Sequence, residues 1–297
     1  MEESGHYYSV YLTAIAVGYD NTHAFLMAFH SQLPDEIRYF DAFELHIKSL
    51  NPFKKSEFGN SYRVGIEETI HSLTGISGEI ETKNTVNSLK SGKYRSLSLE
   101  FGLLLHRLGD SYAHRKLNGL TYSTSEHKIY EIHKTDLIKI GEKSGLPYQY
   151  TRNDFVDHTG HGIDEAFGHH PDEFWKCSGD EYYFRKKMYL NYINKLYFIL
   201  TERIKEEFEY KPRYKQDELI QILNTIINNY RKIGWLRQYT LIYAIRELIE
   251  SREIKMVKYN PEDINPDYMA ILAESAKVNI DEGKLQNAFI NIQNEFN

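Results

Sequence analysis

The chain has 297 residues, of which 41% are hydrophobic, and it carries a formal net charge of -6. This length is sufficient for one large or two modest domains with a buried core. The acidic balance, with Lys and Arg scattered along the chain, argues against stable binding to duplex nucleic acid, for which a basic face is the usual footprint. The single cysteine, Cys177, excludes an intrachain disulfide framework.

The sequence also bears on membrane insertion and export. No apolar run approaches the roughly 20 residues that a transmembrane helix requires. The N-terminus lacks a basic region followed by an apolar region, so it is not typical of a signal peptide. We therefore expect a protein without a transmembrane segment that is cytoplasmic, or that is exported without a cleaved signal peptide.

Helical periodicity and stop signals divide the first half of the chain into helices and loops. A short buried helix near the N-terminus is expected to stop at Gly18. A second helix, capped by Asn21 or Thr22, is expected to stop at Pro34. Residues 51–61 are predicted to form a loop. Further helices are predicted over residues 35–49, 79–90, 94–116 and 123–141.

The second half of the chain is predicted to be helical as well. A long amphipathic helix over residues 181–208 ends at a break over residues 210–214. Three or four more helices follow, over residues 215–231, 234–252, 261–275 and 281–295. Because no stretch alternates like a strand over a useful length, the predicted fold class is all-α. We expect a domain over residues 1–210 and a C-terminal helical region, residues 211–297, packed on it.

One of these helices carries a pattern of metal-binding residue types. His106, Asp110 and His114 are spaced four residues apart, and each such step advances about 40° around a helix, so the three side chains share one face. Two imidazoles and a carboxylate on one face suit a cation such as Zn²⁺. The alternative is a hydrogen-bonded pair of His106 and Asp110, with His114 on the surface.

A second stretch, residues 158–172, packs His, Asp and Glu between glycines. His161 and Glu165 have the same four-residue spacing, while His169 and Asp172 fall in a turn between a glycine and a proline. Glycines allow a backbone to fold tightly around a site. The alternative is a polar loop in which the histidines are incidental.

The distribution of histidine supports a site in the first part of the chain. All 13 histidines lie at or before His170, which either a metal or catalytic centre or a plain composition bias would produce. Three of them, His23, His30 and His46, have no partner in helical register and are expected to be ordinary core or surface residues. Asp35 has the ordinary interpretation of a helix cap.

Several short segments together form an ordered pattern. They are His6-Tyr7-Tyr8, Ser31-Gln32-Leu33-Pro34-Asp35, the segment around His71, Leu105-His106-xxx-Asp110-Ser111-Tyr112-Ala113-His114, Gly160-His161-Gly162 and Gly168-His169-His170-Pro171-Asp172. This pattern resembles the zinc-dependent phospholipase C and single-strand nuclease superfamily, and most closely a bacterial branch of it. The resemblance covers residues 1 to about 175.

The resemblance implies a multi-helix phospholipase C/nuclease-like core, here with a C-terminal helical extension, that holds a zinc cluster. His106 and Asp110 would ligate metal, with Asp110 bridging two ions, and His114 would complete part of that shell. Well-studied members of the superfamily add a processed N-terminal Trp as a ligand, which this sequence does not contain at that place. We therefore expect two or three Zn²⁺ ions, held within residues 1–210.

The resemblance also assigns roles to residues outside the triplet. A further ion would be bound by residues later in the sequence, where either of two pairs, or both, could supply the ligands. The remaining ligands would come from the N-terminal half, where Asp35 is also the candidate catalytic base that orients the attacking water. The residues concerned are His161 with Glu165, His169 with Asp172, and then His6, Asp35 and His71.

The function expected from this resemblance is zinc-dependent hydrolysis of a phosphoester by metal-activated water. A phospholipid is the leading substrate, because the acidic chain offers no basic groove for nucleic acid. A single-strand nuclease of the same superfamily is the first alternative. A catalytically inactive helical interaction module with one structural metal is the second, and it predicts a closed four-coordinate site. A di-iron phosphohydrolase is disfavoured, because the chain has no His-Asp dipeptide.

Overall fold

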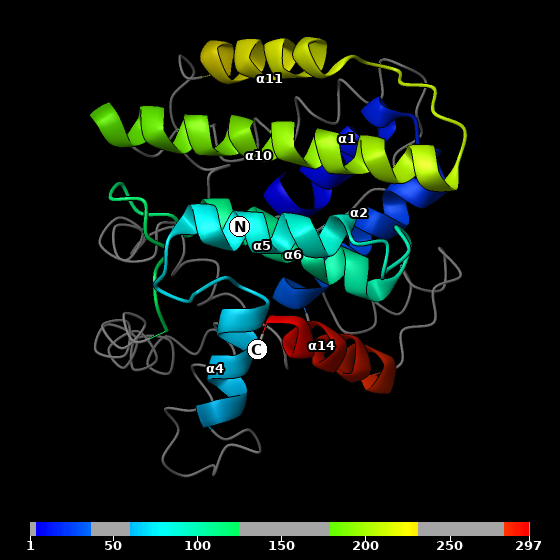
Figure 1. The fold of residues 1–297 in the computed structure, drawn as a ribbon. Helices are drawn as coiled ribbons and strands as arrows, with labels where there is room; N and C mark the ends of the chain where they lie inside the picture. The colour runs from blue at the N-terminus through cyan, green and yellow to red at the C-terminus, as the bar shows by residue number, and fades with distance from the viewer. Residues whose placement is uncertain (1–3, 37–59, 125–178, 231–281, 297) are drawn as a thin grey trace, which may run out of the picture.

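The computed structural model describes residues 4–36, 60–124, 179–230 and 282–296. Within these ranges the chain is helical and contains isolated β-bridges but no named strand, which confirms the all-α prediction (Figure 1). No described helix is long and apolar enough to cross a bilayer. The helices predicted over residues 234–252 and 261–275, and the stretch 158–172, lie outside the described residues, as do nearly all of the helices predicted over 35–49 and 123–141.

The N-terminal segment begins with a π-helical turn and continues into a buried helix. The π-helix, Ser4–Tyr8, precedes α1, Ser9–Val17, in which every residue is buried. Gly18 ends α1 as predicted, with a left-handed φ of 118° and its N–H donated to the carbonyls of Ala14 and Ile15. Packing also requires glycine at position 18, since a Cβ there would overlap the backbone of Lys211.

Helix α2, Asn21–Glu36, does not stop at Pro34 as expected from the sequence but contains it. A proline inside a helix removes one backbone hydrogen bond and crowds the carbonyl four residues earlier. Here that cost falls near the C-terminal end of a helix that is held by tertiary packing. Gly102 of α6 lies directly against His30 of α2, close enough that a Cβ on Gly102 would overlap it. The close contact between α2 and α6 outweighs the local stop signal.

Helices α4, α5 and α6 follow one another along the second described range of the chain. Helix α4, Asn60–Thr69, begins inside the loop predicted over residues 51–61 and was not predicted from the sequence. Helix α5, Gly78–Lys90, agrees with the predicted helix over 79–90. Helix α6, Leu99–Ala113, is shorter than the predicted 94–116, because Ser98 caps its first turn by accepting the N–H of Phe101 at 3.2 Å.

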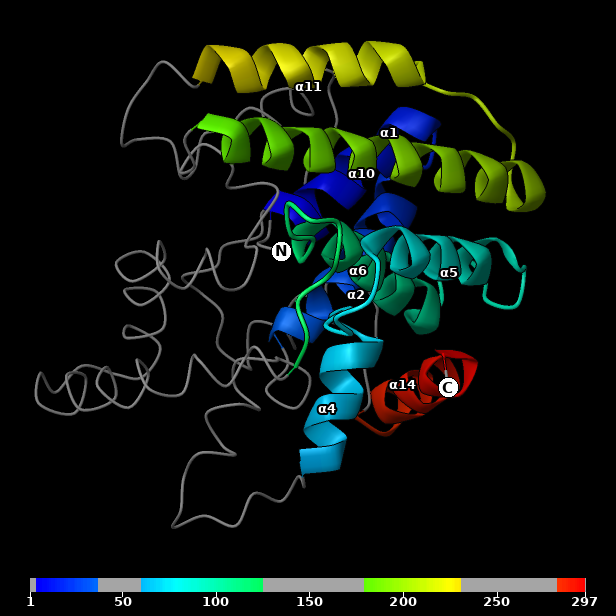
Figure 2. The same cartoon turned by 60° about the vertical axis from the view of Figure 1, so that its left-hand side comes forward.

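The remaining described helices lie on two sides of α5 and α6 (Figure 1). Helix α10, Gly179–Glu207, and helix α11, Gln216–Tyr230, lie along one another on one side. Helix α14, Glu282–Phe296, lies on the other side beside α4 and against α6, as both views show (Figure 1, Figure 2). Helix α6, which is buried from Phe101 to Ala113, is thus enclosed from several directions. The division at residue 210 stays a prediction.

Candidate metal centre

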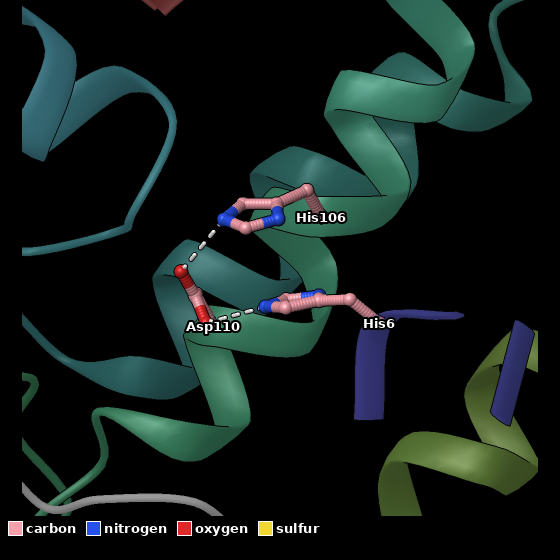
Figure 3. A group of neighbouring side chains, drawn as sticks. All are labelled: His6, His106 and Asp110. Atoms are coloured by element: carbon pink, nitrogen blue, oxygen red, sulfur yellow. Dashed lines mark hydrogen bonds and ion pairs between the residues drawn. The ribbon is translucent and has the colours of Figure 1, made fainter. Parts of the chain in front are cut away.

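Asp110 is the centre of a cluster of histidine side chains. Its carboxylate is fully buried on α6, and its two oxygens face different imidazoles. Oδ1 lies 3.1 Å from Nε2 of His6, and Oδ2 lies 3.1 Å from Nε2 of His106, one helical turn earlier (Figure 3). Oδ2 also lies 3.0 Å from Nδ1 of His71. Three imidazoles from three separate segments therefore converge on one carboxylate.

His114 completes this group from the end of α6. It is the C-cap residue, and its Nε2 lies 3.6 Å from Oδ2 of Asp110. Its side chain is 14% exposed, whereas those of His6, His106 and Asp110 are fully buried, so His114 lies on the side of the cluster nearest to solvent. The three residues of the predicted triplet do point to one place, as their four-residue spacing indicates.

The π-helix brings His6 to the cluster because its backbone is attached to α10. Tyr192 of α10 donates its hydroxyl to the carbonyl of Gly5 at 3.2 Å, and Tyr189 of α10 shares a 2.9 Å hydrogen bond with Ser9. The His6 ring then stacks on that of His106, with ring centroids 3.8 Å apart and planes 17° apart. Short π-helical segments often occur at functional sites.

The hydrogen bonding of His106 fixes which of its nitrogens carries a proton. Its Nδ1 lies 2.8 Å from the carbonyl oxygen of Ser31 on α2, which can only accept, so Nδ1 must donate. Burial lowers the pKa of His106 to about 4, which makes the ring neutral at pH 7. Its Nε2 then presents a lone pair toward the Asp110 carboxylate.

Two facing lone pairs repel one another unless a cation lies between them. The Nδ1 of His71 is 3.2 Å from Nε2 of His106 and 3.0 Å from Oδ2 of Asp110, but one N–H can point at only one of these acceptors. A proton on Nδ1 of His71 therefore bonds one of the two acceptors at a time. A metal ion that accepts both lone pairs removes the conflict.

The charges of the cluster also favour a cation. Burial, together with the neighbouring His106, holds the pKa of His6 well below its usual value. Burial by itself raises the pKa of Asp110, but the cationic groups around it outweigh burial and hold that pKa well below its ordinary range. At neutral pH a buried carboxylate then lies beside the neutral rings of His6 and His106, and a bound cation would neutralise its charge.

The geometry of the cluster fits a small divalent ion. Ligand atoms of His6, His106 and Asp110 all lie within 4.8 Å of one another, and among the described residues these three form a group that can hold a metal ion. Zinc binds imidazole nitrogen at about 2.0–2.1 Å, which separates tetrahedral ligands by about 3.4 Å. The 3.1 Å distances from Asp110 to His6 and to His106 need only a small expansion.

The side chains of the remaining predicted site residues lie outside the described part of the chain. Asp35 lies in the last turn of α2, and its side chain is not described. The two later pairs fall outside the described residues, so their roles stay predictions. They are His161 with Glu165 and His169 with Asp172.

The two described histidines that were expected to be ordinary residues lie apart from the cluster's interactions. His23 is on the surface, where its Nδ1 lies 2.8 Å from Oδ2 of Asp20. His30 is buried against Gly102, and burial lowers its pKa to about 4. His23 pairs with Asp20 and His30 packs against α6, which agrees with the prediction that they are ordinary surface and core residues.

Sequence reasoning missed the groups that orient the ligands. The carbonyl of Ser31 sets the tautomer of His106, but a main-chain acceptor has no residue-type signal in a sequence. Two buried arginines, Arg107 and Arg185, contact the backbone beside His71 and His114. Arg107 is adjacent to His106 and lies within an otherwise apolar stretch, which is the one hint that the sequence offered.

No protein family, curated protein or solved structure matches the chain.

Proposed function

We propose that the protein is a zinc-dependent phosphoester hydrolase of the phospholipase C type. The observation that carries this proposal is the convergence of His6, His71 and His106 on the buried carboxylate of Asp110. Imidazole and carboxylate ligands of this kind are those of catalytic zinc sites. The resemblance to the phospholipase C and nuclease superfamily supplies the reaction class.

The carboxylate of Asp110 is suited to bridging two cations. Its Oδ1 faces His6, while its Oδ2 faces His71, His106 and His114, so the two oxygens have separate sets of nitrogen neighbours. Two or three zinc ions would supply a water of lowered pKa, toward about 7, and positive charge for the phosphate oxygens. Ser31 would hold the neutral tautomer of His106 through its carbonyl oxygen.

The remaining roles follow the resemblance. Asp35 is proposed as the base that orients the attacking water and as a ligand. The later ligands are proposed to be His161 with Glu165, His169 with Asp172, or both pairs. A phospholipid is the proposed substrate because the net charge of -6 disfavours a polyanion such as single-stranded nucleic acid, which is the runner-up.

Burial of the cluster favours a second candidate function. His6, His106 and Asp110 are fully buried, which also suits a closed structural metal site in a non-enzymatic helical module. Such a site fills all four positions with protein ligands and leaves none for water. The two candidate functions differ most near the partly exposed His114, because only an enzyme needs a coordination position there that is open to water.

Metal analysis and hydrolysis assays of one preparation separate these candidates. The purified protein is stripped with a chelator, reloaded with zinc, and assayed on a chromogenic phosphodiester, on phosphatidylcholine vesicles and on a single-stranded oligonucleotide. Zinc-dependent release of the phosphorylated head group supports the proposal. Cleavage of the oligonucleotide alone selects the nuclease, and bound zinc with no turnover of any substrate selects the structural module.

Two variants link the result to the cluster. His106→Ala should lose both zinc and turnover, because it removes a buried ligand. His23→Ala is the matched control, because His23 also pairs with an aspartate but does so on the surface. Equal zinc content in the two variants would contradict the proposed centre.

A further inference from the structure

Two of the four histidines around Asp110 lie outside the body of a helix. His71 follows the end of α4 at Thr69, and His114 is the C-cap of α6. Backbone at such positions has carbonyl groups without helical partners and is less constrained than backbone inside a helix. His106, by contrast, is fixed within α6. The chain therefore needs a separate means of holding the two terminal histidines in place.

Arg107 provides such contacts on both sides of His71. Its guanidinium donates to the carbonyl oxygens of Glu68 and of Thr69, the latter at 2.5 Å, and these are the last carbonyls of α4. Its own carbonyl oxygen accepts the hydroxyl of Ser72 at 3.1 Å. One residue of α6, adjacent to His106, is therefore bonded before and after His71.

The backbone after His71 needs this support. Ser72 has a φ of 53°, in the left-handed region that residues other than glycine rarely adopt. The hydrogen bond to the carbonyl of Arg107 holds Ser72 in that conformation. The turn that aims His71 at Asp110 is thus unfavourable on its own and is maintained by contacts with α6.

The guanidinium of Arg107 is itself held from α5. It forms a buried ion pair with Glu81, and its Nε donates to the hydroxyl of Thr85 at 3.2 Å. The ring of Phe296, in the last turn of α14, covers it, with the guanidinium carbon 4.0 Å from the ring centroid. These contacts fix the planar donor group, whose fork geometry a lysine does not reproduce.

Arg185 of α10 has the corresponding position around His114. Its Nη1 donates to the carbonyl of Ala113 at 3.0 Å and to that of Arg115 at 2.9 Å, the residues on either side of His114. Arg185 is 2% exposed, so these bonds are shielded from water. Both terminal histidines therefore lie close in sequence to backbone carbonyls that accept hydrogen bonds from a buried guanidinium.

We propose that Arg107 and Arg185 are positioning residues of the metal centre, which aim His71 and His114 at Asp110 through the backbone. This inference rests on the proposed metal-dependent function. In neither case is the guanidinium needed as a ligand. Each arginine sets the direction of a histidine, so that its nitrogen lies where a cation is shared with the carboxylate.

The test uses Arg107→Lys and Arg185→Lys in the full chain, with Arg203→Lys as the matched control. Arg203 is similarly buried and also donates to a carbonyl, that of Tyr94, while its ion pairs are with Glu206 and Glu207. Zinc affinity is measured by titration, and the d–d absorption of the cobalt-substituted protein reports the ligand geometry. Groups that orient metal ligands typically contribute 10- to 100-fold in affinity. We expect Arg107→Lys and Arg185→Lys to lose zinc affinity by that factor and to show an altered cobalt spectrum, and Arg203→Lys to show neither change.

Hydrogen exchange of the metal-free protein makes the test independent of metal binding. Arg107→Lys should accelerate exchange in residues 69–73, and Arg185→Lys in residues 113–115, while Arg203→Lys should change neither segment. If wild-type protein binds no zinc, the proposed function fails, and exchange alone then decides whether the arginines position these segments. Affinity and exchange that match Arg203→Lys in both variants would overturn the inference.

A milder variant covers the case in which an arginine variant does not fold. Ser72→Ala removes only the hydroxyl bonded to the carbonyl of Arg107, and Ser91→Ala removes a hydroxyl bonded to Ser88 in the turn after α5. We expect weaker zinc binding and faster exchange near His71 for Ser72→Ala alone. Identical behaviour of the two serine variants would count against the role of Arg107.

Discussion

The Nε2 atom of His106 lies 3.1 Å from Oδ2 of Asp110, while Nδ1 of the same ring donates to the carbonyl of Ser31. The tautomer that Ser31 imposes places a lone pair opposite a carboxylate in a fully buried position. A cation between the two groups would make this contact favourable. We therefore expect the bound cation to control the stability of this part of the protein as well as its chemistry.

Removing the charge of Asp110 should abolish metal binding. Asp110→Asn keeps the shape of the side chain but loses the carboxylate that four histidines face. In wild type, zinc at 100 times its dissociation constant should add about 2.7 kcal/mol to the free energy of unfolding. The variant should show no rise in melting temperature when zinc is added. A zinc-dependent rise equal to that of wild type would refute this assignment of Asp110.

The metal-free protein should lose stability as the pH falls from about 6.5 to about 4. Burial lowers the pKa of His106 and of His30 to about 4, below the unfolded value of 6.5. In that interval the unfolded chain binds more protons than the folded chain, so the stabilisation present above pH 6.5 is lost on acidification. Each histidine contributes about 1.4 kcal/mol per pH unit.

Urea unfolding with a chelator at a series of pH values measures this slope. His30→Gln should reduce the slope by about one proton, because it removes one of the buried histidines without touching Asp110. A slope that is unchanged in this variant, or stability that is constant between pH 6.5 and 4, would show that these rings are not buried neutral.

The close packing of α2 on α6 should not tolerate a side chain at Gly102. A Cβ there would overlap the Cβ and main chain of His30, next to the carbonyl of Ser31 that orients His106. Gly102→Ala should lower the free energy of unfolding by about 1–3 kcal/mol despite the higher helix propensity of alanine. It should also weaken zinc binding.

The matched control for this substitution is Gly65→Ala in α4. A Cβ at Gly65 meets only the end of the Gln293 side chain, which is flexible and can move. Because alanine is the better helix former, this variant should be neutral or stabilising by up to about 1 kcal/mol. Equal destabilisation of both variants, measured by urea unfolding, would contradict the tight α2–α6 contact.

The stacking of Phe296 on Arg107 should contribute to stability. Phe296→Leu retains an apolar side chain but removes the aromatic face, and a buried cation–π contact is worth about 0.5–2 kcal/mol. Phe198→Leu is the control, because Phe198 faces Lys90 at 4.6 Å on an exposed surface. The first variant should be less stable in chemical unfolding than the second, and the reverse order would contradict the prediction.

The sequence predicted those features that depend on neighbours a few residues apart. Helix type, the stop at Gly18 and the common direction of His106, Asp110 and His114 all follow from local geometry, since 3.6 residues make one turn. Local rules were wrong at Pro34, which lies inside α2, and at the start of α4, which begins in a predicted loop. There tertiary packing outweighed the local preference.

Only the tertiary structure decided which distant groups meet. His6 is 104 residues from Asp110 and His71 is 39 residues from it, and no periodicity relates such positions. Their convergence depends on how the π-helix and the turn after α4 pack against α6, and on Arg107 and the carbonyl of Ser31 as fixed partners. The sequence by itself determined the helices and the ligand types, because these are local. Packing determined the site, because contacts between distant segments are set by the whole core.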